Sequence, residues 1–219
     1  MTTTKAYKGL PMEGVIASWY AKTTLKDINR HKLMAEFLVK KIPANGCVLE
    51  IAPGPGYFCI ELAKLGSFQI TGLDISKSFV EIARGNAREA GLEIDFREGN
   101  ASAMPFEDGT FDFIFCQAAF KNFSEPVKAI SEMYRVLKPG GIAVIADMRR
   151  DASAADIEHE IHGMGLDPLN RFFVKWTFDH MLIKNAYSLN QMKAMVAQTP
   201  FGTCRIDVKG VGFMVWLEK

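Results

Sequence analysis

Residues 48–56 place a carboxylate and two glycines at the end of an apolar run. The segment reads Val-Leu-Glu-Ile-Ala-Pro-Gly-Pro-Gly, so Glu50 closes the run and Gly54 and Gly56 follow within a turn. An amphipathic stretch, 57–64, comes directly afterwards. Glycines between a strand and a helix let the backbone approach a ligand closely, and the helix start offers free N–H groups to it. This combination is typical of a nucleotide-type site.

A second carboxylate, Asp74, ends the next apolar run. One carboxylate at this position can accept both vicinal hydroxyls of a ribose, whichever adenosine-containing ligand lies across the strand ends. The fingerprint of NAD-binding proteins also needs a third glycine, three residues after the second, for close packing of helix and strand. Cys59 stands at that position, where its side chain obstructs the contact. An NAD-type oxidoreductase therefore stays an alternative that this residue argues against.

The elements that would position these carboxylates alternate along the chain. Apolar runs alternate with helical patterns through the middle of the sequence, which predicts βαβ units and a parallel sheet. The predicted strands are 47–51, 68–73, 94–97, 111–116 and 142–147. Ser76 and Ser124 are predicted N-caps of the helices that follow the second and fourth strands. The Lys-Pro-Gly-Gly sequence at 138–141 is predicted to end the second of these helices.

The two ends of the chain add further elements. Helices are predicted at 14–22 and 25–42, before the first strand. Ser188 is predicted to cap a helix that runs to Gln198, and two strands follow at 204–208 and 213–217. The short turn between these strands favours an antiparallel hairpin.

Further motifs follow the later strands. Gly-Asn-Ala stands at 99–101, Met-Pro-Phe-Glu-Asp-Gly-Thr-Phe-Asp at 104–112, and Gln117 follows the fourth strand. In order and spacing the set resembles class I S-adenosylmethionine-dependent methyltransferases, most of all the small-molecule branch with the ubiquinone/menaquinone-biosynthesis enzymes. The resemblance covers 13–148 well and 188–217 loosely. The family's motif E/D-x-G-x-G-x-G appears at 50–56 with Ala52 at its first glycine, and alanine disfavours a positive φ there.

The resemblance implies a Rossmann-like α/β fold with a seven-stranded mixed sheet, mostly parallel with an antiparallel C-terminal strand, and helices on both faces. It implies one domain, divided into N-terminal lid helices (1–42), a cofactor-binding core (43–150), a helical insertion on the acceptor side (151–187) and a last helix with a hairpin (188–219). The implied activity is methyl transfer from S-adenosyl-L-methionine to a small molecule. A non-catalytic binding protein on the same fold stays an alternative.

The resemblance also implies the cofactor-binding residues: Tyr20, Glu50, Ala52, Pro53, Gly54, Asp74, Ile75, Asn100, Ala101 and Gln117. Glu50 would orient the methionine ammonium, Asp74 would accept the ribose hydroxyls, and Gln117 would lie beside the transferred methyl group. Ala52, Pro53 and Gly54 would pass under the methionyl and ribose groups. Ile75 would pack on the adenine face, Ala101 would offer its N–H to the ring, and Tyr20 would close over the cofactor. Asn100 departs from the family's usual aspartate, but its amide oxygen can still accept from the adenine amino group.

Each of these positions also has a structural alternative. Glu50 can cap turn N–H groups, and Asp74 can cap a helix, although Ser76 is the better cap. Asn100 is equally well explained as a turn residue.

No general base can be assigned from the residues. Lys121 and His180 are weak candidates for a catalytic role. His159 and His162 are one residue too close for the H-E-x-x-H zinc motif, so no metal is predicted. The apolar segment 169–183 either lines a cavity for a lipophilic or aromatic acceptor, or packs on the core and a second subunit of a homo-oligomer.

Composition excludes several classes. The 219 residues are 48% hydrophobic and 23% charged with a formal net charge of +1, so no basic field is present to hold nucleic acid. No apolar run reaches the roughly 20 residues of a membrane span, and residues 1–12 lack the pattern of a secretory signal. The four cysteines form no C-x-x-C pair, which predicts reduced, buried thiols in a cytoplasmic protein.

Overall fold

The computed structural model describes residues 7–8, 12–163 and 185–219. It contains a seven-stranded sheet in the order β3-β2-β1-β4-β5-β7-β6. The strands are β1 (Cys47–Ile51), β2 (Gln69–Asp74), β3 (Asp95–Glu98), β4 (Phe111–Gln117), β5 (Leu137–Met148), β6 (Arg205–Lys209) and β7 (Gly212–Glu218). Strands β1 to β5 pair in parallel, whereas β7 pairs antiparallel with both β5 and β6. The predicted mixed sheet is confirmed.

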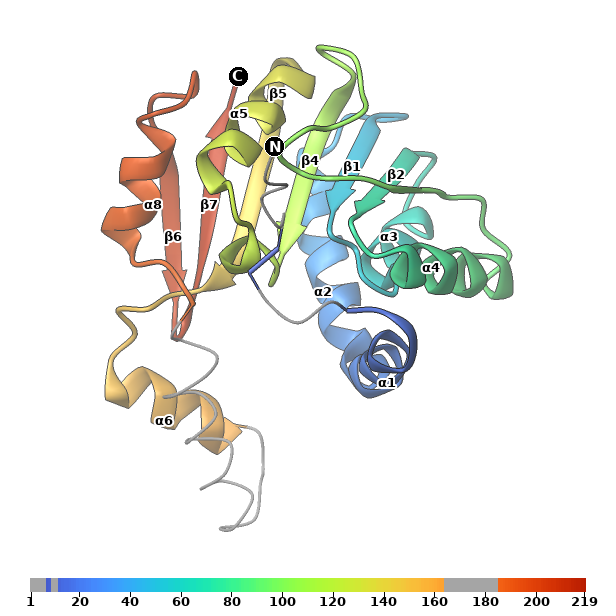
Figure 1. The fold of residues 1–219 in the computed structure, drawn as a ribbon, viewed down its shortest axis with the longest axis horizontal. Coiled ribbons are helices and arrows are strands. Elements are labelled where there is room, and N and C mark those ends of the chain that lie inside the picture. The colour runs from blue at the N-terminus through green and yellow to red at the C-terminus, as the bar shows by residue number, and fades with distance from the viewer. Residues whose placement is uncertain (1–6, 9–11, 164–184) are drawn as a thin grey trace, which may run out of the picture.

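Helices cover both faces of this sheet (Figure 1). Along β4, Phe113 and Phe115 pack on α2 (Ile28–Leu38), α3 (Tyr57–Ala63) and α4 (Lys77–Glu89). The alternate residues Ile114 and Cys116 pack on α5 (Pro126–Val136) and α8 (Leu189–Val196). Side chains of successive strand residues point to opposite faces, so a strand buried on both sides is apolar throughout. Two apolar layers therefore hold the sheet, and polar groups are left to its ends.

Two short helices lie beyond the carboxyl ends of the strands. These are α1 (Gly14–Thr24) and α6 (Ala154–Gly163), at the lower right and lower left of Figure 1. The predicted helix over 25–42 is interrupted, because η1 (Leu25–Asp27) and η2 (Val39–Lys41) are 3₁₀ turns on either side of α2. A further 3₁₀ turn, η3 (Phe120–Asn122), follows β4. Among the described residues, no helix is long and apolar enough to cross a membrane.

Several local predictions need correction. Residues 138–141 do not lie outside the strand, because β5 begins at Leu137 and Gly140 donates to the carbonyl of Lys219. Ser124 does not cap α5: the N-cap is Glu125, and the buried hydroxyl of Ser124 has no hydrogen-bond partner. By contrast, Ser76 and Ser188 cap α4 and α8 as predicted.

The cysteine prediction is half right. All four thiols are free, and Cys59 and Cys116 are buried. Cys47 and Cys204 are partly exposed, because the first begins β1 and the second precedes the edge strand β6.

Candidate functional site

The polar residues predicted for the site gather at the carboxyl ends of neighbouring strands. Glu50 lies in β1, Asp74 ends β2 and Gln117 ends β4. Their strands are adjacent in the sheet, since β1 pairs with both β2 and β4 in parallel. The crevice outside the carboxyl ends of such strands is where open α/β sheets bind ligands.

The turn after β1 adopts the left-handed backbone that the glycine motif requires. Ala52, Gly54 and Gly56 have φ of 56°, 53° and 79°. A Cβ atom on Gly56 would lie 2.8 Å from the ring of Phe96, so close packing requires glycine there. A Cβ atom on Gly54 would meet nothing within 4 Å. Gly56 thus serves helix packing, whereas Gly54 leaves open space at the site.

Ala52 adopts the conformation of the glycine that it replaces in the motif. Its N–H donates to the carbonyl of Leu73 at 2.8 Å, which holds the turn against β2. A left-handed conformation costs a residue with a Cβ atom roughly 1–2 kcal/mol. The alanine therefore stores strain and does not change the course of the turn.

We expect Ala52→Gly to stabilise the protein modestly. Relief of roughly 1–2 kcal/mol of strain outweighs the roughly 0.5–1 kcal/mol that glycine loses in backbone freedom. Urea unfolding should show a gain of about 0.5–1 kcal/mol with an unchanged m-value. A loss of stability would mean that contacts of the Ala52 methyl group outweigh the strain.

Glu50 is a buried carboxyl with an unusual partner. It is 4% exposed, and the thiol of Cys59 donates to its Oε2 at 2.9 Å. Burial raises the pKa of Glu50 to about 7. Cys59, which the sequence marked only as an obstruction to NAD, therefore holds the carboxyl in place. Nothing in the sequence separation of nine residues indicated this contact.

Asp74 is held by backbone groups of both neighbouring turns. Its Oδ2 accepts from the N–H of Gly54 at 3.0 Å and its Oδ1 from the N–H of Ser76 at 2.9 Å. Burial raises the pKa of Asp74 to about 6. Each carboxylate oxygen has a second lone pair, so the fixed group can still accept two hydroxyls. The cap of α4 is Ser76, not Asp74, and the capping alternative for Asp74 falls away.

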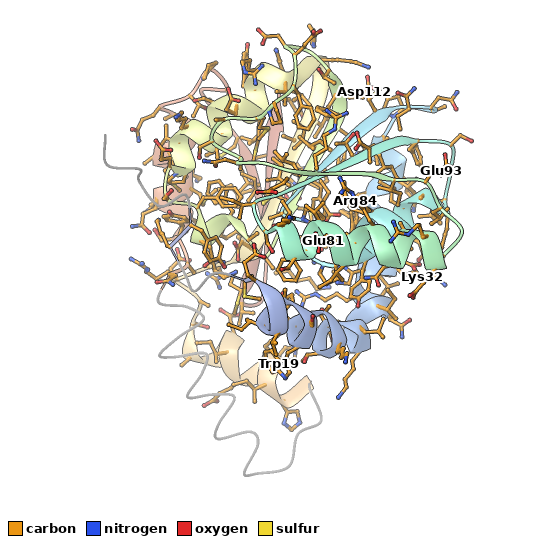
Figure 2. The ribbon with its side chains drawn as sticks, turned by 45° about the vertical axis from the view of Figure 1, so that its right-hand side comes forward. Trp19, Lys32, Glu81, Arg84, Glu93 and Asp112 are labelled. Atoms are coloured by element: carbon orange, nitrogen blue, oxygen red, sulfur yellow. The ribbon has the colours of Figure 1, made fainter. Side chains whose placement is uncertain are left out.

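The apolar residues near Asp74 remain accessible. Ile75 is 41% exposed, unusual for an isoleucine that directly follows a buried strand end. Tyr20, from α1, contacts the ring of Phe79 edge-on, with centroids 5.7 Å apart. Its neighbour Trp19 points away from α4 into solvent (Figure 2). Tyr20 and Ile75 thus offer exposed apolar surface beside the carboxylate.

A contact that the sequence did not predict fixes α1 beside the site. The carboxylate oxygens of Glu13 accept from the N–H groups of Lys77 and Ser78, at the start of α4. The Ser76 hydroxyl donates to the carbonyl of Met12 at 2.6 Å. Because an acidic side chain is favourable at a helix N-terminus, Glu13 attaches the N-terminal helix to α4.

Two amides complete the arrangement. The Oδ1 of Asn100 accepts from the N–H of Ser102 at 2.9 Å, which is the turn role considered above, and Ala101 lies within this turn. The Oε1 of Gln117 is buried and has no hydrogen-bond partner. A buried amide oxygen without a partner is costly. A donor from a bound molecule would satisfy it.

Of the two residues considered for a catalytic role, the structure describes Lys121. The Nζ of Lys121 donates to Asp147 Oδ1 at 2.8 Å and to the carbonyl of Ala118 at 2.6 Å. The Lys121 and Asp147 side chains are 11% and 2% exposed, so the pair is largely removed from water. One of the three ammonium protons is left for a ligand. His180 lies outside the described residues, as does the apolar segment 169–183.

Within the described ranges, no group of three or more metal-ligating side chains comes together. Asp112, at the start of β4, accepts from the N–H of Cys47 and pairs with Lys138. It lies at the end of the molecule opposite Trp19 and α1 (Figure 2). This carboxylate is structural.

Comparisons with known proteins agree with this geometry. Residues 49–145 match the family model described as a methyltransferase domain. Over 122 residues the chain is 34% identical to demethylmenaquinone methyltransferase of Thermus thermophilus, which aligns 55% of this chain and 54% of that protein. It is 32% identical over 129 residues to the ubiquinone/menaquinone biosynthesis C-methyltransferase UbiE of a Marinomonas species, covering 56% and 51% of the two chains. The chain thus spans about half the length of these relatives.

Among solved structures, the fold is shared with a proposed S-adenosyl-L-methionine-dependent methyltransferase from Methanococcus maripaludis. That alignment covers 100% of this chain and 97% of the other, with a TM-score of 0.76 and 23% identity. Residues 49–145 therefore match a methyltransferase domain, which agrees with the resemblance that the sequence motifs indicated.

Proposed function

We propose that this protein binds S-adenosyl-L-methionine and transfers its methyl group to a small aromatic or lipophilic molecule. The unpartnered Oε1 of Gln117, buried where the methionine end of the cofactor would lie, carries this proposal. The open space beside Gly54 and the exposed face of Ile75 fit the same ligand. The names of the relatives, which act in menaquinone and ubiquinone biosynthesis, support an aromatic acceptor.

Each residue would hold one part of the cofactor. The Asp74 carboxylate would accept the ribose hydroxyls while Gly54 and Ser76 keep it in place. Glu50 would face the methionine ammonium, Ile75 and Tyr20 would enclose the adenine, and Asn100 and Ala101 would meet its edge. Ala52 and Pro53 would pass beneath the sugar.

When bound, the sulfonium supplies an already activated methyl group for an in-line displacement. The protein's part is to hold the acceptor behind that methyl group and exclude water. The positive charge of Lys121 is balanced by Asp147, so Lys121 is better suited to donate a hydrogen bond to an acceptor oxygen than to remove a proton. In this proposal residues 1–42 cover the cofactor, 43–150 bind it, 151–187 cap the acceptor, and 188–219 complete the sheet. The reaction would take place in the cytoplasm.

A calorimetric titration tests cofactor identity. We expect S-adenosylhomocysteine to bind with a Kd in the micromolar range or lower and NAD not to bind. Binding of NAD alone would replace this proposal with the oxidoreductase alternative.

A transfer assay tests the reaction. Label from methyl-labelled S-adenosylmethionine should appear in an extractable aromatic product when 1,4-naphthohydroquinone or a related phenol is supplied. Cofactor binding without transfer to any acceptor of this class would favour the non-catalytic alternative.

A further inference from the structure

Tyr7 lies at the site although it is far from the site motifs in sequence. It forms an antiparallel bridge with Phe123, and the N–H of the next residue, Lys8, donates to the carbonyl of Asn122 at 2.8 Å. Both partners belong to the connection after β4. In Figure 1 the short blue segment of residues 7–8 accordingly lies beside the carboxyl end of β4. The backbone of this segment is therefore fixed beside the connection that carries Lys121 and follows Gln117.

A second anchor holds the same segment. The Nζ of Lys8 donates to the hydroxyl of Tyr187 at 2.7 Å and lies 5.2 Å from the centre of its ring. Tyr187 in turn contacts the ring of the fully buried Phe120, with centroids 5.8 Å apart. Three interactions thus fix the backbone of residues 7 and 8 beside the connection that follows β4.

Carboxylates from two sides of the proposed site act on the Tyr7 hydroxyl. Its hydroxyl experiences the charges of Asp74 at the end of β2 and Asp147 at the end of β5, and it lies near Tyr20. Burial, with these neighbouring groups, raises the pKa of Tyr7, so its hydroxyl stays protonated at neutral pH. The protonated hydroxyl can donate to a group bound between Asp74 and the Lys121–Asp147 ion pair.

We propose that Tyr7 is a positioning residue that closes the site at the point of methyl transfer and directs its hydroxyl at the atom group bound there. This inference rests on the proposed function, because Asp74 and Gln117 define that point only if they hold the cofactor. In the proposed function the transferred methyl group lies between the ribose, held by Asp74, and the acceptor, on the side of Asp147. The hydroxyl of Tyr7 experiences the charges of both carboxylates.

Two cofactor analogues distinguish this role from a structural one. S-Adenosylhomocysteine has a bare sulfur at the transfer point, whereas sinefungin carries an amine there. We expect Tyr7→Phe to weaken sinefungin about tenfold or more while changing the affinity for S-adenosylhomocysteine less than about threefold, because only the amine can bond the hydroxyl. Tyr7→Ala, which also removes the ring, should weaken both ligands. Calorimetric titration measures all four affinities.

Tyr134→Phe is the matched control. It removes the hydroxyl of a tyrosine on α5 whose ring packs against Phe201 and Lys219, outside the contacts that hold residues 7 and 8. It should therefore leave the ratio of the two affinities unchanged. A loss of fold stability alone should also leave this ratio unchanged, and thermal unfolding of each unliganded variant measures that loss. An unchanged ratio in Tyr7→Phe, with both ligands bound by the wild type, overturns the role of Tyr7 alone. Failure of the wild type to bind either ligand overturns the proposed function as well.

Discussion

Glu50→Gln should make the protein more stable at pH 8 and at the same time weaken its binding of the cofactor. The carboxyl is 4% exposed, and burial raises its pKa from 4.5 to about 7. The folded state therefore holds a proton that the unfolded state releases near pH 4.5. Between these values stability falls as pH rises, by about 3 kcal/mol in total for this one group. Glutamine does not titrate, so the variant escapes this loss.

The measurement is urea unfolding of both proteins between pH 4.5 and 8. Burial also raises the pKa of Asp74 to about 6, so Asp74 lowers the stability of both proteins as pH rises. The effect of Glu50 is therefore read from the difference between the two stability curves. The curves should separate as pH rises and run parallel above about pH 7. Parallel curves throughout would show that Glu50 is ionised in the folded protein at all these pH values.

The functional half of the prediction uses the same variant. A neutral amide cannot attract the methionine ammonium as a carboxylate does, so S-adenosylhomocysteine should bind about 10–100-fold more weakly at pH 8. In the wild type, affinity should rise with pH up to about 7, because the carboxyl must lose its proton to face the ammonium. Glu61→Gln is the control. Glu61, on α3, is also buried, but it pairs with Lys64 at the end of that helix, and its loss should leave the affinity unchanged.

Asp74→Ala should reduce binding of S-adenosylhomocysteine by about 100-fold or more. The change removes the acceptor of both ribose hydroxyls and also releases the N–H groups of Gly54 and Ser76, which shape the site. Two lost hydrogen bonds to a charged group correspond to about 3 kcal/mol or more. Asparagine should rescue only partly, because its NH₂ group would face one of the two N–H donors.

Calorimetric titration of the Asp74 variants is compared with that of Asp112→Asn. Asp112 also accepts from a backbone N–H, that of Cys47, but lies at the opposite end of the sheet. Its variant should bind S-adenosylhomocysteine like the wild type. If Asp74→Ala stays within about threefold of the wild type, the ribose does not lie against Asp74.

Local signals predicted what depends on neighbours in sequence. Apolar runs bounded by turn residues located all seven strands to within a few residues, except at the start of β5. There the residues 138–141 carry a helix-stop signal, yet Gly140 and Gly141 bond to Lys219, directly after β7, because pairing with a neighbouring segment outweighs local propensity. The Ser124 cap failed for a related reason. Pro126 begins α5 one residue later than a Ser124 cap requires, which leaves the serine hydroxyl buried beside the helix.

The sequence by itself determined the fold class, the glycine turn and the carboxylates at the ends of β1 and β2. These follow from periodicity and from residue types at short spacing, which act through the local backbone. Only the tertiary structure decided the partners of those groups. It set the thiol of Cys59 against Glu50, paired Lys121 with Asp147, left Gln117 without a partner and brought Tyr7 to the strand ends. Such contacts arise where strands and loops distant in sequence meet, and burial then sets the pKa values and hydrogen bonds that no local pattern encodes.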